Sequence, residues 1–361
     1  MRSIPLFKVY MPSTVIVSLE KTLMSGFIGQ GPRVEDFEKE LKQWLGYKYL
    51  ATVNTGTSAL HLALRLLKIG VGDEVISTPL TCTATNWPVL LSGADLVWAD
   101  VNRSDCNISV SDIKAKVTSR TKAILVVHWG GYACDLDELA ELGIPIIEDC
   151  AHSFGAEYSG KKIGTSGNLC AFSFQAIKTF TTIDGGMLTM AKQHLKRAKL
   201  LRWYGIDRED NRKDFRCEND IAEYGDKLHM NDIAAVIGSH QLLHVDRLLR
   251  TQRENAHFYN QHLKDLSGVT LLQQESNRNS SYWLYTILVD NQKDFIRYMS
   301  EQGVSCSRVH ERNDIHSCVK QYKVDLPNVD YLTKSMVCIP VGWWVTTEDR
   351  EYILECMRRG W

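Results

Sequence analysis

The sequence has no excess of charge of either sign. Its 361 residues include 42 Lys and Arg and 43 Asp and Glu, which gives a formal net charge of −1. Nucleic acids and acidic membrane surfaces attract proteins through clustered Lys and Arg side chains, and local basic runs are also missing. The charge balance therefore gives no reason to expect a nucleic-acid or a membrane partner.

Signals for metal binding, export and membrane insertion are also missing. The ten cysteines include no CxxC pair, so the sequence lacks the usual zinc and redox motifs. No apolar run approaches the ~18 residues of a membrane-spanning helix. Pro5, Lys8 and Pro12 interrupt the N-terminal stretch where a signal peptide would need an apolar core. We therefore expect a cytoplasmic protein with reduced thiols.

Two short motifs have a suggestive spacing but lack the other parts of a site. His240 and His244 are four residues apart, as in helical zinc sites, but neither an intervening Glu nor an obvious third ligand accompanies them. Gly29 and Gly31 lie in GQGPR, which has neither the spacing nor the preceding strand of a dinucleotide-binding loop. We expect no metal site and no dinucleotide site here.

The sequence does contain a series of short, continuous apolar runs. They lie at 49–53, 74–78, 95–99, 123–129, 144–149, 170–174 and 186–190. Strands that are covered on both faces have this pattern. Helical segments alternate with the runs, and the first of them places Leu60, Ala63, Leu64 and Leu67 on one stripe. The alternation predicts an α/β fold with a mostly parallel sheet.

The last third of the chain has a different pattern. Residues 231–263 predict one long helix or two successive helices, with Asn231 as the N-cap. Residues 281–289 are typical of a strand. We therefore expect a large α/β domain at 1–240 and a smaller α+β domain at 241–361, and the first twenty or so residues could pack on the smaller domain.

One candidate site lies in NTGTSALHLALRLL. Gly56 stands where the first strand turns into a helix, so Thr57 and Ser58 would lie at the helix N-terminus. Backbone N–H groups and two hydroxyls at that position would bind a phosphate. Simple N-capping by Thr55 or Thr57 explains the segment equally well, and both interpretations stay open.

A second candidate site follows the apolar run IPII. Asp149 would lie at the carboxyl end of a buried strand, where ligands of open α/β sheets bind. An ionised Asp there could keep a pyridine nitrogen protonated, although an Asp at a strand end is also a common loop cap. His152 could donate to a phenolic oxygen of the same ring, or it could be a structural histidine.

The third candidate is Lys178, in SFQAIKTFTTIDGG. A lysine amine can form a Schiff base with an aldehyde cofactor, and pyridoxal phosphate enzymes place a lysine and a carboxylate at opposite ends of one ring. Asp149 precedes Lys178 by 29 residues (178 − 149), enough for a loop and another strand. Ser173 could add a phosphate hydroxyl. A surface lysine is the alternative, but the apolar surroundings argue against it.

The motifs occur in an order that resembles one enzyme family. FIGQGPRVEDFEKEL, NTGTSALHLAL, IIEDCAHSFG, IKTFTTIDGG and KLHMNDIAAVIG are similar to blocks of the nucleotide-sugar aminotransferases, the DegT/StrS group of fold type I pyridoxal phosphate enzymes. The resemblance covers most of the chain and is strongest over residues 26–240. It implies a mostly parallel mixed sheet flanked by helices, with a smaller α+β C-terminal domain.

The resemblance also implies roles around the cofactor ring. Lys178 would bind the cofactor covalently, Asp149 would pair with the ring nitrogen, and His152 would lie near the phenolic oxygen. Cys82, in TCTATNW, departs from the pattern, because the family usually has an aromatic residue there that stacks on the ring. Other side chains that could stack instead are Trp87 and Trp129.

The phosphate would be bound from two subunits if the resemblance holds. Thr57, Ser58 and Ser173 would bind it within one chain. Asn231, in MNDIAA, corresponds to an Asn that reaches the phosphate from the neighbouring subunit. The resemblance therefore implies a homodimer with shared active sites.

The family's reaction moves an amino group from L-glutamate to a nucleotide-linked keto-sugar, for an amino sugar of a surface polysaccharide or glycoconjugate. The TTxxGG form after Lys178 resembles members that act on 4-keto-6-deoxy sugars. The alternatives are a dehydratase or eliminase on the same fold, or a non-catalytic regulator. Lys178 argues against the dehydratase branch, whose members have His at that position. Residues that could select the sugar are Arg308 and His310.

Overall fold

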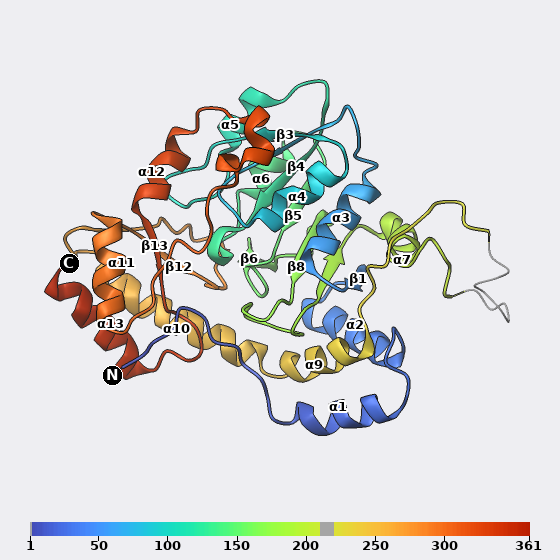
Figure 1. Ribbon diagram of the computed structural model, residues 1–361, viewed down its shortest axis with the longest axis horizontal. Helices are drawn as coiled ribbons and strands as arrows, with labels where there is room; N and C mark the ends of the chain where they lie inside the picture. The colour runs from blue at the N-terminus through green and yellow to red at the C-terminus, as the bar shows by residue number, and fades with distance from the viewer. Residues whose placement is uncertain (1, 210–219) are drawn as a thin grey trace.

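A seven-stranded sheet forms the centre of the protein (Figure 1). The computed structural model describes residues 2–209 and 220–361. The strands follow the order β1-β9-β8-β5-β4-β2-β3. Their bounds are β1 Leu50–Val53, β2 Glu74–Ser77, β3 Asp95–Trp98, β4 Thr121–Val127, β5 Ile146–Asp149, β8 Leu169–Ser173 and β9 Gly186–Thr189. Each apolar run that predicted a strand contributes one of them, and the predicted fold class is confirmed.

One strand of this sheet runs against the others. β9 pairs antiparallel with β8 on one side and with β1 on the other, whereas β2, β3, β4, β5 and β8 pair in parallel. The loop that separates β8 from β9 contains no helix of the kind that usually carries the chain back between parallel strands. β9 therefore begins, at Gly186, on the edge where the other strands end.

Helices cover both faces of the sheet, because alternate residues of each strand point to opposite sides. In β4, Ala123 and Leu125 pack in the cluster that includes α3 and α4, while Ile124 and Val126 pack with α5 and α6. The bounds of these helices are α3 Gly56–Leu66, α4 Thr83–Leu91, α5 Val110–Lys116 and α6 Leu136–Ala140. The continuous apolar runs are explained by this two-sided burial.

Three further helices lie below the sheet in Figure 1: α1 Val15–Met24, α2 Pro32–Leu45 and α9 Asp232–Leu242. α2 packs against β1, α9 packs on α2, and α1 packs on α9. Phe37 of α2 lies so close to α9 that a Cβ added at Gly238 would be 2.5 Å from its ring. The same ring stacks on Phe180 at 5.9 Å, two residues after Lys178. The α2–α9 pair therefore supports the loop that carries the candidate lysine.

The predicted long helical region is two helices. α9 ends at Leu242 and α10 Val245–Leu263 follows at once. Asn231 is the N-cap of α9, because its side chain accepts a hydrogen bond from the Ala234 N–H at 2.9 Å, which confirms that prediction. The proposed domain boundary at residue 240 falls in the last turn of α9, and the division into two domains stays a proposal.

The C-terminal part has its own antiparallel sheet, β10-β12-β13, and the N-terminal segment joins it. Ile4 bridges to Val304 and packs in the same cluster as α11 and α13, and both chain ends lie there in Figure 1. Its elements are β10 Val269–Leu271, β12 Tyr285–Val289, α11 Gln292–Glu301, α12 Pro327–Ser335, β13 Met336–Ile339 and α13 Thr347–Arg359.

The remaining elements are short. A small sheet joins β11 to the β6–β7 hairpin and so links the two parts of the chain. The bounds are β6 Glu157–Tyr158, β7 Lys161–Lys162, β11 Arg278–Asn279, α7 Leu195–Leu201, η1 Trp129–Gly131, η2 Lys192–His194, η3 Asn313–Ile315 and η4 Ser317–Tyr322. Within residues 2–209 and 220–361, none of the helices has the length and hydropathy to cross a membrane.

Candidate active site

A cavity of about 360 Å³ opens at the carboxyl edge of the parallel strands. Asp149 ends β5 and Ser173 ends β8, so the parallel topology brings two of the candidate residues to one edge. Six of the eight predicted site residues line this cavity: Thr57, Cys82, Asp149, His152, Ser173 and Lys178. Ser58 and Asn231 do not belong to its lining.

Asp149 lies at the buried end of the cavity, and its carboxylate is held at both oxygens. The Thr85 hydroxyl donates to Oδ2 at 2.7 Å, and the Ala151 N–H donates to Oδ1 at 3.0 Å. Burial raises the pKa of Asp149, while these two hydrogen bonds and the nearby Lys178 charge act in the opposite direction. A cationic ring nitrogen in the cavity would further favour the ionised carboxylate.

Lys178 reaches the same cavity from the loop after β8. Its side chain is partly exposed because it opens onto the cavity, but the surrounding protein still desolvates the amine. Burial lowers the pKa of Lys178 from its usual 10.5 to about 8, against the opposing effect of Asp149. Because its pKa is lowered, the Lys178 amine is easier to deprotonate than the amine of a surface lysine. Its Nζ lies 3.7 Å from the centre of the Trp283 ring.

His152 is a neutral ring within an aromatic stack. Its ring stacks on Trp283 at 4.1 Å and faces His310 at 5.7 Å with nearly parallel planes. Burial holds the pKa of His152 well below its usual range. The Gly130 N–H points at Nδ1 at 3.3 Å, so the neutral ring carries its proton on Nε2. His152 can then donate one hydrogen bond from Nε2.

The turn from β1 into α3 forms an anion cradle at the cavity. Thr55 is the N-cap, and its side chain accepts from the Ser58 N–H at 2.9 Å. The first two amides of the helix, at Gly56 and Thr57, have no partner among the residues that the structure describes. A Cβ at Gly56 would lie 2.7 Å from the Ser173 Cβ. The capping by Thr55 is confirmed. It leaves two amides that could bind an anion, and the phosphate site stays a prediction.

Ser58 and Asn231 are placed differently from the other candidates. The Ser58 hydroxyl donates to Asn54 Oδ1 at 2.6 Å and accepts from Thr55, so local hydrogen bonds occupy it. Asn231 is exposed at the start of α9, where its side chain caps the helix. The predicted phosphate contacts of both residues stay predictions.

Neither Trp87 nor Trp129 is placed to stack on a cofactor ring in the cavity. Trp87 contacts His316 edge-on, and the Trp129 indole donates to Thr286 at 3.1 Å. Neither residue belongs to the cavity lining, whereas Cys82 and Ala151 do. The lining therefore has small side chains at Cys82 and Ala151, and neither is aromatic.

Three residues of the site were missed or only partly anticipated from the sequence. Thr85 lies in the TCTATNW segment quoted above, so its position near Cys82 was a usable signal. Trp283 had none, because it is separated by 105 positions (283 − 178) from the lysine that it contacts. Of the two suggested sugar-binding residues, His310 lines the cavity, whereas Arg308 pairs with Glu311 at 2.6 Å.

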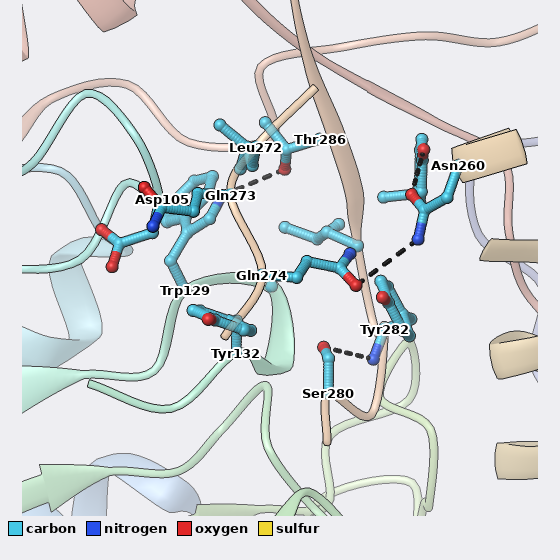
Figure 2. Close-up of a pocket in the computed structure, with 13 residues that line it drawn as sticks. Asp105, Trp129, Tyr132, Asn260, Leu272, Gln273, Gln274, Ser280, Tyr282 and Thr286 are labelled. Carbon is cyan, nitrogen blue, oxygen red and sulfur yellow. Dashed lines mark hydrogen bonds between the residues drawn. The ribbon is translucent and has the colours of Figure 1, made fainter. Parts of the chain in front are cut away.

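A second, smaller cavity lies behind Trp129, and Figure 2 shows how its polar groups are arranged. Its volume is about 40 Å³, which suits a few water molecules at most. Asn260 donates to Gln274 at 3.5 Å, and the Tyr282 N–H donates to Ser280 at 3.0 Å. These groups are already engaged with one another, so we do not assign a ligand to this cavity.

A buried cluster on the opposite face of β5 has ligand types that metals use. His128, Glu148 and Cys150 place their ligand atoms within 4.8 Å of one another. His128 already uses both ring nitrogens, with Glu148 at 2.9 Å and the Cys134 N–H at 3.1 Å. The hydrogen bonds account for the cluster without an ion.

The dismissed HQLLH motif also has ordinary partners. His240 contacts Thr14 at 3.1 Å through one nitrogen and Ser18 at 2.9 Å through the other. His244 packs against Tyr10 beyond the end of α9. These contacts attach the N-terminal segment to α9.

The cavity suits pyridoxal phosphate. It combines a deprotonatable amine at Lys178, a buried carboxylate at Asp149 and an anion cradle that begins at Gly56. The missing Cβ of Gly56 allows the close approach of α3 to β8, and the two unpartnered helix amides match a phosphate group. Together these groups match the three chemical parts of the cofactor: the aldehyde, the ring nitrogen and the phosphate.

The chain is similar to known aminotransferases over nearly its whole length. The DegT/DnrJ/EryC1/StrS aminotransferase family matches residues 11–358. The structure of AtS13 from Actinomadura melliaura is 43% identical, with a TM-score of 0.97 and 100% of both chains covered. The sugar aminotransferase CalS13 from Micromonospora echinospora is 38% identical, with a TM-score of 0.96, over 99% of this chain and 100% of its own.

Curated relatives extend the comparison to named reactions. The UDP-4-amino-4-deoxy-L-arabinose–oxoglutarate aminotransferase of Shewanella sediminis is 34% identical, over 80% of this chain and 76% of its own. The GDP-perosamine synthase of Vibrio cholerae is 34% identical, over 76% of this chain and 74% of its own.

Proposed function

The chain belongs to the DegT/DnrJ/EryC1/StrS aminotransferase family and is a sugar aminotransferase, and from this premise we propose its substrates. The amino donor is L-glutamate. The acceptor is a nucleotide-linked keto-deoxysugar, aminated at C4, and the product is an amino sugar for a polysaccharide or glycoconjugate. The observation that carries the proposal is the cavity in which Lys178, Asp149 and the Gly56 cradle meet.

Pyridoxal phosphate is the cofactor that these residues would hold. When bound, it supplies an aldehyde that exchanges amino groups and a ring that withdraws electrons from the substrate carbon. Lys178 would attach it, Asp149 would bind the ring nitrogen, and the amides of Gly56 and Thr57 would bind the phosphate. His152 would donate its Nε2–H to the ring oxygen, since its Nδ1 already accepts from Gly130.

Lys178 is also the residue that moves the proton. Transamination needs a base that removes a proton from one carbon and returns it to another. A pKa of about 8 keeps part of the Lys178 amine neutral near neutral pH, which a surface lysine does not achieve. Trp283 lies against the amine at 3.7 Å, so it limits where the Nζ can move.

The choice of substrates rests on the named relatives and on the cavity. The Shewanella relative's name includes oxoglutarate, which L-glutamate becomes when it loses its amino group, and it places the amine at C4 of a UDP-linked sugar. His310 offers a buried ring nitrogen without a partner among the described residues, suited to a sugar hydroxyl. Ile177, 37% exposed at the cavity, offers an apolar contact to a deoxy carbon.

A homodimer with shared sites is part of the proposal. α1 and the residues that follow it expose several large apolar side chains: Ile16 64%, Val17 57%, Leu23 50%, Met24 80%, Phe27 77% and Ile28 47%. So many exposed apolar side chains on one segment are typical of an interface. Asn231 would reach the cofactor phosphate of the neighbouring subunit from the start of α9.

The decisive experiment uses L-glutamate without any sugar. We expect the protein loaded with pyridoxal phosphate to release one equivalent of 2-oxoglutarate per site and to retain the amino group on its cofactor, because transamination proceeds in two separate halves. Absence of 2-oxoglutarate would instead favour an elimination or dehydration reaction. Reduction with borohydride before glutamate is added should leave the cofactor on the peptide that contains Lys178, and mass spectrometry can locate it.

The acceptor can then be identified by turnover. The glutamate-treated protein should transfer its amino group to nucleotide-linked 4-keto-6-deoxy sugars, and NMR of the product would show at which carbon the amine lies. Exclusive reaction with 3-keto sugars would overturn the assignment to C4 while leaving the aminotransferase reaction intact.

A further inference from the structure

We propose that Asp232 is a positioning residue that holds a glycine-rich arm, residues 26–31, together with Asn231 in the shape that the neighbouring subunit's active site requires. The inference rests on the proposed dimer, in which Asn231 reaches the partner's cofactor phosphate. Asp232 does not line the cavity of its own chain. Its proposed role is at the active site of the neighbouring subunit.

The Asp232 carboxylate joins the arm to α9. Although only 1% exposed, it accepts hydrogen bonds from three N–H groups at the start of α2: Gly31 at 2.8 Å, Arg33 at 3.3 Å and Val34 at 3.1 Å. Its own backbone N–H donates to the Gly29 carbonyl at 2.8 Å. A carboxylate at a helix N-terminus also interacts favourably with the helix dipole. One residue therefore fixes the arm on both sides of Gly31.

The contact leaves no room for a side chain at Gly31. A Cβ added at Gly31 would lie 2.8 Å from Asp232 Oδ2. GQGPR, which lacked the features of a dinucleotide-binding loop, thus has a structural explanation: Gly31 permits the approach of the carboxylate, and Pro32 begins α2 at a position that needs no N–H.

The arm and Asn231 do not line their own active site. Asn231 is exposed next to the buried Asp232 and does not line the cavity of its own chain. Phe27 and Ile28 of the arm are 77% and 47% exposed. A free monomer gains nothing from an arm that is fixed this rigidly while its apolar side chains face solvent.

The rim of the cavity offers a surface on which such an arm could dock. Ile183 is 57% exposed and has a φ of 73°, a conformation that is costly for a β-branched residue. It is followed by Asp184 and Gly185, which line the cavity. An exposed apolar residue held in strained backbone at the cavity matches an apolar arm from a second copy of the chain.

The first experiment tests whether Asp232 affects cofactor binding beyond its effect on stability. We expect apo-Asp232→Ala to bind pyridoxal phosphate about tenfold more weakly than the wild type in a fluorescence titration. Asp100 is a matched control: it is also buried, and it accepts from the Asn328 and Val329 N–H groups at the start of α12, which likewise begins with a proline. Asp100→Ala should lower the unfolding midpoint similarly but leave the cofactor affinity unchanged.

The second experiment tests whether Asp232 acts on the partner's site. Hybrid dimers of one Asp232→Ala subunit and one Lys178→Ala subunit can be purified through two different tags. If the arm acts across the interface, each hybrid contains one site with both changes and one site with neither. We expect one site per hybrid with wild-type affinity and with the visible absorbance of lysine-bound cofactor. If Asp232 acts only within its own chain, each site has a defect and no such site exists.

The outcomes separate this inference from the proposed dimer. Hybrids of Asn231→Ala with Lys178→Ala report on the shared site itself. If they regain one tight site and the Asp232 hybrids do not, the role of Asp232 is wrong and the shared site stands; if neither regains one, the shared site is wrong. Asp232→Asn, which keeps one acceptor oxygen for Gly31 and Val34, repeats the test should Asp232→Ala fail to fold. Unchanged affinity in both Asp232 variants also overturns the inference.

Discussion

The Nζ atom of Lys178 lies 3.7 Å from the centre of the Trp283 ring, close enough for a cation–π contact. This contact favours the charged amine, whereas burial, the larger influence, disfavours it and lowers the pKa to about 8. His152 stacks on the same indole at 4.1 Å. Trp283 therefore connects the candidate residues Lys178 and His152, although it comes from the C-terminal part of the chain.

The first prediction concerns the pH dependence of cofactor attachment. Only the neutral amine reacts with an aldehyde, so the rate at which the apo-protein captures pyridoxal phosphate should rise with pH and level off above about 8, the pKa of Lys178. Trp283→Leu keeps the site apolar but removes the cation–π contact, so the midpoint should move to lower pH. Stopped-flow absorbance measures both profiles.

Nα-acetyl-lysine, whose side-chain amine is free, serves as the reference, because pyridoxal phosphate has ionisable groups of its own that affect the profile. Its reaction should show a midpoint near the ordinary lysine pKa of ~10.4. A wild-type profile that follows this reference would mean that the site does not lower the Lys178 pKa.

The second prediction concerns Thr85, which donates to Asp149 Oδ2 at 2.7 Å. Because this hydrogen bond lowers the Asp149 pKa against the effect of burial, Thr85→Val should raise that pKa. The acid limb of kcat/KM should then move to higher pH, since less of the carboxylate is ionised at a given pH. A hydrogen bond to a charged group contributes ~1.5–3 kcal/mol, so the rate at neutral pH should fall about tenfold or more.

Thr85→Ser is the control for this change because it keeps the hydroxyl. We expect its pH profile to match the wild type within error. If Thr85→Val lowers the rate equally at all pH values, the side chain affects packing and not the ionisation of Asp149.

The sequence predicted the large sheet well because the signal there is local. Strands such as β4 are buried on both faces, so their residues form continuous apolar runs. The order of the strands and the reversal at β9 depend on pairing between distant segments, which leaves no local pattern. The two-residue strands β6, β7 and β11 are too short to show any periodicity.

The site could be predicted to the extent that it lies at strand ends. Asp149 and Ser173 each close an apolar run, and Gly56 marks a strand-to-helix turn. Trp283 and His310 enter the same site by tertiary packing of the C-terminal part. Nothing in their own neighbourhoods signals this, because Lys178 and His152, the candidate residues that they contact, lie more than a hundred positions away in the sequence.

The third prediction tests the phosphate cradle through Gly56. A Cβ there would lie 2.7 Å from the Ser173 Cβ and 3.1 Å from its Cα, so α3 would have to move away from β8. We expect Gly56→Ala to weaken pyridoxal phosphate binding about tenfold or more, in an equilibrium titration of the apo-protein. At Gly70, a Cβ would meet only an ordinary contact at 3.8 Å. Gly70→Ala should therefore bind normally, and equal losses in both variants would contradict the cradle.

The fourth prediction concerns the buried ion pair beneath β1. Arg202 Nη1 donates to Glu38 Oε1 at 2.6 Å, and the Thr52 N–H and hydroxyl donate to the same oxygen at 2.9 Å. Arg202→Met would leave a buried carboxylate without its cation, which should lower the free energy of unfolding by ~3–5 kcal/mol in urea titrations at neutral pH. The exposed Arg297, which pairs with Asp294, is the control. Arg297→Ala should change the free energy of unfolding by less than ~0.5 kcal/mol.

The same pair predicts how stability responds to acid. Arg202 and the Thr52 donors outweigh the effect of burial and hold the Glu38 pKa below its usual value of 4.5. A carboxyl whose pKa is lower in the folded state stabilises the protein above its unfolded pKa, and this contribution is lost as the pH falls through the folded pKa. Wild-type stability should therefore decline more steeply below about pH 4.5 than that of Glu38→Gln/Arg202→Met, which has no charge at either position. Parallel decline of the two proteins would show that Glu38 does not contribute to acid unfolding.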